Sequence, residues 1–164
     1  MRPSPFKPEA TTTNHPFDGA NFVRDTVGKL VWHKVFNRTL YADTDRSGVV
    51  YHANYLRYFE LGRSCLMRDV GYPYKEVEDS GYVYPIIDLG VTYHSPLYYD
   101  DPMWIYTRPG EISRVKVAFN YIIAHAETNK IVCIGFTQHC AINQSGWPIA
   151  IDKKTVQLWK TFPK

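Results

Sequence analysis

Apolar and polar residues alternate along most of the second half of the chain. Apolar residues occupy every second position in four segments, at residues 87–93, 103–107, 115–123 and 132–142. A period of two predicts β-strands with one buried face. Turn-forming residues separate these segments, at 100–102, 109–110 and 128–130. The pattern therefore predicts four strands joined by short turns, which makes sequential neighbours antiparallel.

A different period precedes these strands. Apolar residues recur at helical spacing in one stretch, at Tyr55, Tyr58, Phe59, Gly62 and Leu66. This spacing predicts one long helix with a single buried face, ending near Val70. Asn54 is a candidate N-cap, and Gly71 is a candidate stop signal. Gly62 costs about 1 kcal/mol relative to Ala in a helix, so its place on the apolar face predicts close approach of another backbone.

The remaining segments complete a single-domain plan. Strand-forming residues fill Leu30–Tyr41, residues 71–81 read as an acidic loop, and Lys153–Trp159 reads as a short final helix. Prolines and polar residues dominate the start of the chain. We therefore expect a flexible N-terminal extension over residues 1–27, anchored by Phe6, Phe17 and Phe22, and one domain over residues 28–164.

Composition narrows the classes of function. The chain has 164 residues and a net charge of +3, which is too mild to indicate nucleic-acid binding. It contains no apolar run near the roughly 20 residues that a membrane span needs, and its start does not resemble a secretory signal. The three cysteines, Cys65, Cys133 and Cys140, form no paired motif. Reduced thiols in a cytoplasmic protein are the simplest interpretation.

The densest group of polar residues lies just before the predicted helix. Asp43 and Asp45 flank Thr44 in a turn that also contains Gly48. A carboxylate in such a turn usually bonds its own backbone, and we assign Asp43 to that role. The spacing of these residues also resembles that of the ligands in a calcium-binding EF-hand loop. The position that needs a bidentate Glu is occupied by Asn54, so we expect no calcium or other metal site here.

This segment resembles the hotdog-fold acyl-CoA thioesterases. The similarity is strongest to the branch that contains 4-hydroxybenzoyl-CoA thioesterase and the Tol–Pal-associated (YbgC-like) enzymes. The matching residues are Tyr41, Asp43, Asp45, Gly48, Val49, Val50, Tyr51, His52, Asn54, Tyr55, Phe59, Glu60 and Arg63. The resemblance implies an α+β hotdog fold, in which an antiparallel sheet of about five strands wraps around one long central helix. It also implies hydrolysis of acyl-CoA thioesters without a cofactor.

The resemblance assigns roles to individual residues. Asp45 is the expected catalytic carboxylate, acting as nucleophile on the thioester carbon or as general base on water. The helix start at Tyr51 and His52 is the expected oxyanion site, with the backbone N–H of His52 as donor. The His52 side chain could also bind substrate or move a proton. Asn54 and Tyr55 are candidate substrate contacts.

The phosphates of CoA require basic residues. Arg114 and Lys116 lie two apart on a predicted strand, and we expect them either to grip CoA or to be ordinary surface charges. In the family the CoA site usually forms across a dimer interface, which implies a homodimer or a tetramer built from dimers.

Two alternative functions remain open from the sequence. One is a non-hydrolytic hotdog domain that binds an acyl carrier protein or serves as a scaffold. The other is a dehydratase that acts on 3-hydroxyacyl thioesters. The presence of Asp45 argues against an inert scaffold, and the Asp-Thr-Asp turn is typical of thioesterases rather than dehydratases.

Overall fold

A computed structural model of the protein describes residues 6–10 and 21–164. The helices are the single 3-10 turn Tyr41–Asp43, α1 (Asn54–Asp69), α2 (Tyr74–Asp79) and α3 (Lys153–Thr161). The strands are β1 (Pro8–Ala10), β2 (Phe22–Asp25), β3 (Val31–Arg38), β4 (Ile86–Tyr93), β5 (Pro102–Ile112), β6 (Lys116–His125) and β7 (Ile131–Cys140). None of the helices in these residues is long and apolar enough to cross a membrane.

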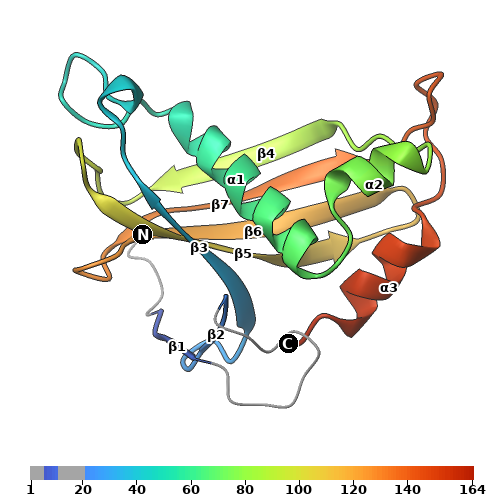
Figure 1. Ribbon diagram of the computed structural model, residues 1–164, viewed down its shortest axis with the longest axis horizontal. Coiled ribbons are helices and arrows are strands. Elements are labelled where there is room, and N and C mark those ends of the chain that lie inside the picture. The colour runs from blue at the N-terminus through green and yellow to red at the C-terminus, as the bar shows by residue number, and fades with distance from the viewer. Residues whose placement is uncertain (1–5, 11–20) are drawn as a thin grey trace.

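All the strands belong to one antiparallel sheet. Their order is β1-β2-β3-β5-β6-β7-β4, and every neighbouring pair is antiparallel. The sheet curves around α1, which lies along its concave face, and α2 and α3 close one end (Figure 1). This arrangement confirms the predicted hotdog fold. The sheet has seven strands rather than about five, because β1 and β2 extend it beyond β3.

The N-terminal residues contribute to this extension. Phe22 and Val23 are buried, and β2 pairs with β3 from Phe22 opposite His33 onward. Phe6 packs edge-on against the rings of Trp32 and Tyr106. The sheet therefore begins before residue 28, where we had placed the start of the domain. Residues 1–5 and 11–20, with the predicted anchor Phe17, lie outside the described residues.

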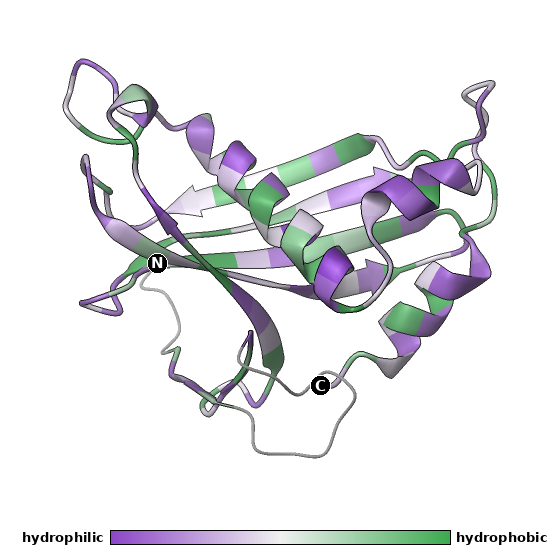
Figure 2. Ribbon diagram, viewed as in Figure 1, coloured by the Kyte–Doolittle hydropathy of each residue, from purple (hydrophilic) through white to green (hydrophobic). Residues whose placement is uncertain are grey.

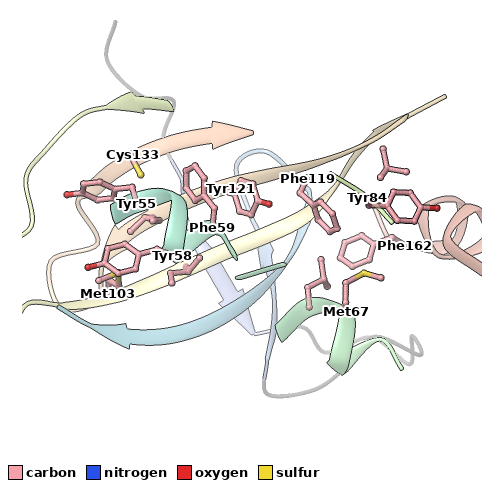
Figure 3. Packing of buried hydrophobic residues seen from close by; sticks show 14 of the residues in the cluster. Tyr55, Tyr58, Phe59, Met67, Tyr84, Met103, Phe119, Tyr121, Cys133 and Phe162 are labelled. Carbon is pink, nitrogen blue, oxygen red and sulfur yellow. The ribbon is translucent and has the colours of Figure 1, made fainter. Parts of the chain in front are cut away.

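The helix prediction is confirmed, and so is its buried face. Each of the five residues that set the helical spacing is buried. Phe59 is fully buried and stacks on Tyr121 at 4.2 Å between ring centroids, with the planes 7° apart (Figure 3). A Cβ on Gly62 would lie 2.3 Å from Thr107 Oγ1, so glycine is required by side chains of β5 rather than by a backbone. Figure 2 shows hydrophobic and hydrophilic residues alternating along α1.

Three local predictions need correction. Residues 74–79 form helix α2 within the segment that we read as a loop, because the buried Val77 anchors one turn against the core. Strand β5 continues through Pro109-Gly110, where an irregular register replaces the predicted turn. Asn54 is the first helical residue and not the N-cap, which is Ala53. The predicted final helix is present as α3.

Candidate active site

A tight hairpin carries Asp45. The Asp45 N–H donates to the Val49 carbonyl at 2.9 Å, and the Gly48 N–H donates back to the Asp45 carbonyl at 2.9 Å. Gly48 has φ of +81°, which glycine adopts without strain. The Asp45 side chain is half-buried, and its Oδ1 accepts from the Ser47 N–H at 2.7 Å. Its Oδ2 has no hydrogen-bond partner among the described residues, so one carboxylate oxygen can act on a ligand.

Asp43 occupies the base of the same hairpin. Its side chain is 6% exposed, and its carboxylate accepts from the Leu40 N–H at 2.9 Å and from the Tyr58 hydroxyl at 2.8 Å. Burial raises the pKa of Tyr58, and the hydrogen bond to Asp43 raises it further. The Asp43 carboxylate thus has two internal donors, whereas Asp45 has one. This difference agrees with our assignment of Asp43 to the turn.

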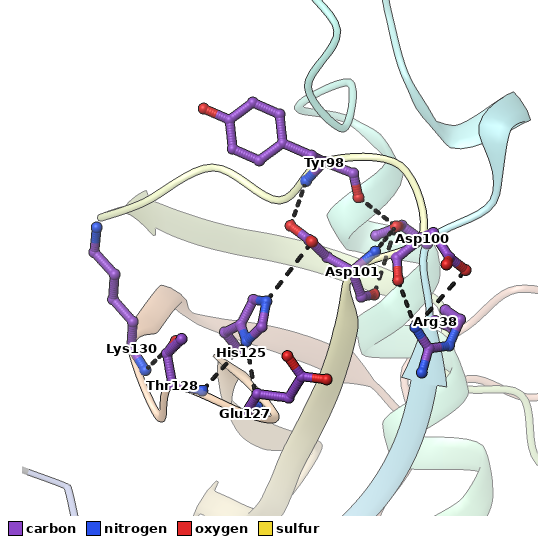
Figure 4. Close-up of polar contacts among 9 residues, drawn as sticks. Arg38, Tyr98, Asp100, Asp101, His125, Glu127, Thr128 and Lys130 are labelled. Atoms are coloured by element: carbon purple, nitrogen blue, oxygen red, sulfur yellow. Dashed lines mark hydrogen bonds and ion pairs between the residues drawn. The ribbon is translucent and has the colours of Figure 1, made fainter.

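A second loop supports the hairpin from the side of β5. Val49 forms a bridge with Tyr98, and the Val50 N–H donates to the Leu97 carbonyl at 2.8 Å. Asp101 holds this loop by accepting from the Tyr98 N–H at 2.8 Å, and it lies 3.7 Å from His125 Nε2 (Figure 4). The position of the hairpin therefore depends on strands far from it in the sequence.

The start of α1 presents free backbone donors. The Tyr51 N–H donates to the Asp43 carbonyl at 2.9 Å, which ties the helix start to the hairpin. In the described chain, no protein acceptor binds the N–H groups of His52 and Ala53. The Tyr93 hydroxyl donates to the His52 carbonyl at 2.7 Å, which orients this peptide. Free N–H groups at a helix N-terminus stabilise negative charge, as an oxyanion site requires.

The other predicted contacts of this region are placed differently. Asn54 is half-buried, and its amide donates to the Asp43 carbonyl at 2.9 Å. Tyr55 is 3% exposed and packs edge-on against Tyr58 and Tyr93, and burial raises its pKa to about 12. Both side chains therefore support the hairpin and the helix start, and their role as substrate contacts stays a prediction.

Arg114 and Lys116 lie at the opposite end of the sheet. Both are exposed; Arg114 is in the connection before β6, and Lys116 is the first residue of β6. Lys116 pairs with Cys140 on β7, whereas Tyr93, beside the helix start, pairs with Cys133. Cys133 and Cys140 are separated by about 23 Å along β7, at roughly 3.3 Å per strand residue. The predicted CoA contacts and the predicted catalytic residues therefore do not meet within this chain.

Strand β4 forms an exposed edge of the sheet. It pairs with β7 on one side only, and its apolar residues Ile86, Ile87 and Leu89 are each more than 40% exposed. An unpaired edge strand is usually protected from pairing with another chain by charged residues, by proline or by a segment that covers it. Such an edge with apolar side chains is typical of a surface that another strand covers.

A cavity of about 280 Å³ lies under the C-terminal half of α1. Residues of α1 cover it, residues of β4, β6 and β7 form its floor, and residues of α2 and α3 close its far end. Its wall is mostly apolar or aromatic, with Met67, Phe119 and Trp159 among the lining residues. Ile86, at the start of the exposed edge strand, also lines it. A second cavity of about 500 Å³ lies between α1 and the end of β3, and Glu60 lines both.

A chain of buried hydrogen bonds runs through the floor of the first cavity. His139 Nδ1 lies 2.9 Å from the Tyr84 carbonyl oxygen, which can only accept, so the proton sits on Nδ1. Nε2 then accepts from the Thr137 hydroxyl at 2.9 Å, and that oxygen accepts from Tyr121 at 2.8 Å. Burial lowers the pKa of His139 to about 4, so the ring is neutral at pH 7. Arg63 lies beside the Tyr121 hydroxyl and opposes the effect of burial, which raises the pKa of Tyr121.

Sequence reasoning did not single out this network. His139 follows the strand alternation without any motif, and Arg63 entered only as a continuation of the family pattern. No local signal links the two, because Arg63 lies on a helix and His139 lies on a strand more than seventy residues later.

Comparison with known proteins decides the family. A model of the thioesterase-like superfamily matches residues 40–157, which include the hairpin, α1, the start of α3 and the residues that line the cavity except Trp159. The chain belongs to the thioesterase-like superfamily. Its relatives include YneP of Bacillus subtilis (strain 168), named as a candidate acyl-CoA thioesterase, which is 30% identical over 75% of this chain and 84% of that protein.

Two solved structures share the fold of this thioesterase-like chain. A hypothetical protein from Aquifex aeolicus is 30% identical with a TM-score of 0.72, and the match covers 77% of this chain and 98% of that one. A probable thioesterase from Bartonella henselae is also 30% identical, with a TM-score of 0.68 and coverage of 74% and 99%. Both matches leave part of this chain uncovered while taking in almost all of the other protein.

Proposed function

We propose that this protein hydrolyses acyl-CoA thioesters to the free acid and CoA. The observation that carries this proposal is that the segment from the hairpin to the start of α1 holds both a free carboxylate oxygen on Asp45 and free N–H groups. Hydrolysis of a thioester needs an oxygen nucleophile and stabilisation of the oxyanion, and these two groups supply them. Membership of the thioesterase-like superfamily, and the activity named for YneP, support the same assignment.

The thioester carbonyl oxygen accepts from the His52 N–H, and the Asp45 carboxylate acts on the carbonyl carbon. Attack by Asp45 itself gives a mixed anhydride and releases the CoA thiolate; water then cleaves the anhydride and restores the carboxylate. Alternatively, Asp45 takes a proton from a water molecule as that water attacks. Both routes consume one water and yield the acid and CoA. The Tyr93 hydroxyl fixes the His52 peptide in either case.

In this proposal the active form is a homodimer in which two copies pair through β4. Two such dimers could also form a tetramer. Antiparallel pairing of β4 with the same strand of a second copy brings opposite ends of the two strands together. The end at Tyr93, beside the helix start of one protomer, then meets the end at Ile86, beside the cavity and Lys116 of the other. The separation of about 23 Å within one chain is thereby bridged between chains.

Arg114 and Lys116 are the proposed contacts for the CoA phosphates in this assembly. Both are exposed, and neither forms an ion pair with any described residue. An acyl carrier protein presents its thioester on the same pantetheine arm, so it is an alternative carrier for the same site. The three cysteines in the described structure are free thiols, which supports our proposal of a cytoplasmic location.

The test uses thiol release from a panel of short, long and aromatic acyl-CoAs. Asp45→Asn removes the anionic oxygen but keeps the side-chain size, and it should lower kcat by at least about 10²-fold. Asp79→Asn, an exposed residue on α2, is the matched control and should keep wild-type kcat. Both variants should unfold at the wild-type temperature. Absence of thiol release from the whole panel, or near-normal turnover by Asp45→Asn, would overturn the proposal.

A further inference from the structure

The face of the sheet that points away from α1 carries a second apolar cluster. Adjacent residues on two of its strands, His33 and Thr107, face α1, since they lie against Asp69 and Gly62 of that helix. Because side chains alternate between the two faces of a strand, their neighbours face outward. The buried members of this outer cluster come from β2, β3, β5 and β6, and they are Val23, Trp32, Tyr106, Ile122 and Ala124. None of the described residues grouped in it belongs to a helix.

Phe6 packs on the centre of this outer cluster. Its ring centroid lies 5.9 Å from that of Trp32 and 4.8 Å from that of Tyr106, and it meets both rings edge-on, at 86° and 71°. Aromatic pairs of this kind contribute about 0.5–1.5 kcal/mol each beyond the area that they bury. The contact therefore joins the segment before β1 to two strands from the middle of the sheet.

A buried carboxylate holds this segment in place. Asp25, the last residue of β2, accepts from the Lys7 N–H at 2.9 Å. The same carboxylate accepts from the N–H groups of Val27 and Gly28 at 3.1 and 2.8 Å. A Cβ on Gly28 would lie 2.4 Å from Asp25 Oδ2, so a side chain there would displace the carboxylate. These bonds fix the backbone at Lys7 and thereby direct the adjacent Phe6 onto the outer face.

The segment that carries Phe6 is an addition to the shared fold. The region matched by the superfamily model starts at residue 40, so Phe6, β1 and β2 precede it. Without Phe6, the rings of Trp32 and Tyr106 would lie bare beside the half-buried Trp104. At about 150–250 Å² per aromatic side chain, the three rings offer roughly 450–750 Å², against the roughly 800 Å² that each partner buries in a stable interface. An uncovered patch of this size is large enough to bind another protein.

We propose that Phe6 and β1 form an intramolecular cap on the outer face of the sheet, and that without this cap the face binds a second copy of the chain. Two sheets pack face to face readily, and a two-fold axis would give each copy the same apolar side chains to contact. The contact differs from the pairing through β4, because it uses the face of the sheet and not its edge. The cap thus prevents the assembly from growing through this face.

Two cations on the same face give the association a salt dependence. The Lys34 ammonium lies 4.5 Å from the ring centroid of Trp104, and the Arg108 guanidinium lies 5.8 Å from that of Trp32. Two copies that met through this face would bring these like charges together. At about 1 M salt the Debye length is about 3 Å, so the repulsion is screened. Association of the uncapped protein should therefore be stronger at high salt than at low salt.

The test measures the molar mass of the full chain by light scattering at about 1 M sodium chloride. Phe6→Ser removes the ring, and the mass should rise to at least twice that of the wild type. Phe6→Leu keeps an apolar cover and should keep the wild-type mass. Val27→Ser removes an exposed apolar side chain from the turn after β2, and as the matched control it should also keep that mass. A wild-type mass for Phe6→Ser would overturn the proposal.

A second substitution identifies the surface that associates. Ile134, opposite Ile122 on β7, also belongs to the outer face. Ile134→Lys combined with Phe6→Ser should restore the wild-type mass, because a lysine charge without a partner is costly to bury in such a contact. A mass that stays high in the double variant would place the association on another surface. A mass below that of the wild type for Ile134→Lys alone would show that the capped face is already an interface. Either result would overturn the proposal.

The melting temperature of each variant shows whether it is folded. If Phe6→Ser unfolds, Phe6→Ala removes the same ring without adding a hydroxyl and replaces it in both measurements. These measurements need no substrate, so their outcome is independent of whether the protein hydrolyses thioesters. They compare each variant with the wild type, so they are also independent of how many copies pair through β4.

Discussion

The Tyr58 hydroxyl donates a hydrogen bond of 2.8 Å to the Asp43 carboxylate, and this bond joins the central helix to the hairpin that carries Asp45. Asp43 is 6% exposed, and Tyr58 is 5% exposed. A buried bond between these positions makes the placement of Asp45 a property of the core rather than of a surface loop.

The contribution of this bond to stability should be measurable as a coupling free energy between Tyr58 and Asp43. Tyr58→Phe leaves the Asp43 carboxylate with one donor fewer and should lower the free energy of unfolding by about 1–3 kcal/mol. Asp43→Asn should also destabilise, and the double variant should cost less than the sum of the two. Urea unfolding of the four proteins gives the coupling free energy. Additive losses would show that the two side chains do not act together.

Stability should depend on pH through His139. Its pKa falls from 6.5 in the unfolded chain to about 4 in the folded protein, mainly because of burial. Between these values the unfolded chain binds a proton that the folded protein does not, so the free energy of unfolding decreases as pH falls. The loss between pH 7 and pH 5 should be about 2 kcal/mol from this residue.

His139→Gln should weaken that dependence, although it lowers stability at every pH. Urea unfolding at pH 7 and pH 5 gives the difference for each protein, and His52→Gln, at an exposed residue, is the control. The same loss between pH 7 and pH 5 in wild type and His139→Gln would show that another group causes it.

The exposed edge strand leads to a prediction about assembly. Leu89→Lys places a charge among the apolar residues of β4, and burying that charge in a dimer interface would cost several kcal/mol. Light scattering should give at least twice the 19.0 kDa chain mass for the wild type and a lower mass for the variant, because the contact through β4 is lost. Thiol release should be lost with the dimer, and Glu78→Lys on α2 should alter neither. A fully active monomeric variant would show that each chain carries a complete site.

Replacement of Arg114 and Lys116 by Ala should affect binding more than chemistry. The phosphates of CoA lie far from the reacting carbonyl, so their contacts stabilise the bound substrate and the transition state alike. KM for acyl-CoA should rise at least about fivefold while kcat changes little. A truncated substrate, the pantetheine thioester, should show no change in KM. Unchanged KM for acyl-CoA would leave these residues as ordinary surface charges.

The sequence predicted the elements whose signal is periodic. The spacing of Tyr55, Tyr58 and Phe59 predicted the buried face of α1, and the alternation near Val117 and Ile134 predicted strands of the sheet. Helix α2 was missed because six residues give too little periodicity, and only the burial of Val77 against the core stabilises it. The continuation of β5 through Pro109-Gly110 was missed because a local turn signal is overridden by pairing with β6.

The sequence predicted only the part of the candidate site that lies in one continuous segment. Asp45 and His52 belong to one continuous motif, so their resemblance to a family could be read along the chain. Arg63, His139 and Trp159 come from three distant elements and line one cavity, so their proximity depends on how the sheet curves around α1. Arg114 and Lys116, the proposed CoA contacts, lie at the opposite end of the sheet from Asp45, and the sequence pattern of one chain does not show whether they share a site.

The Tyr84 carbonyl oxygen has an effect on reactivity that extends beyond its own hydrogen bond. By holding the proton on Nδ1 while Thr137 occupies Nε2, it leaves His139 without a lone pair for a water molecule in the cavity. The floor of the cavity therefore offers no free histidine base, and Asp45 remains the general base or nucleophile that we propose.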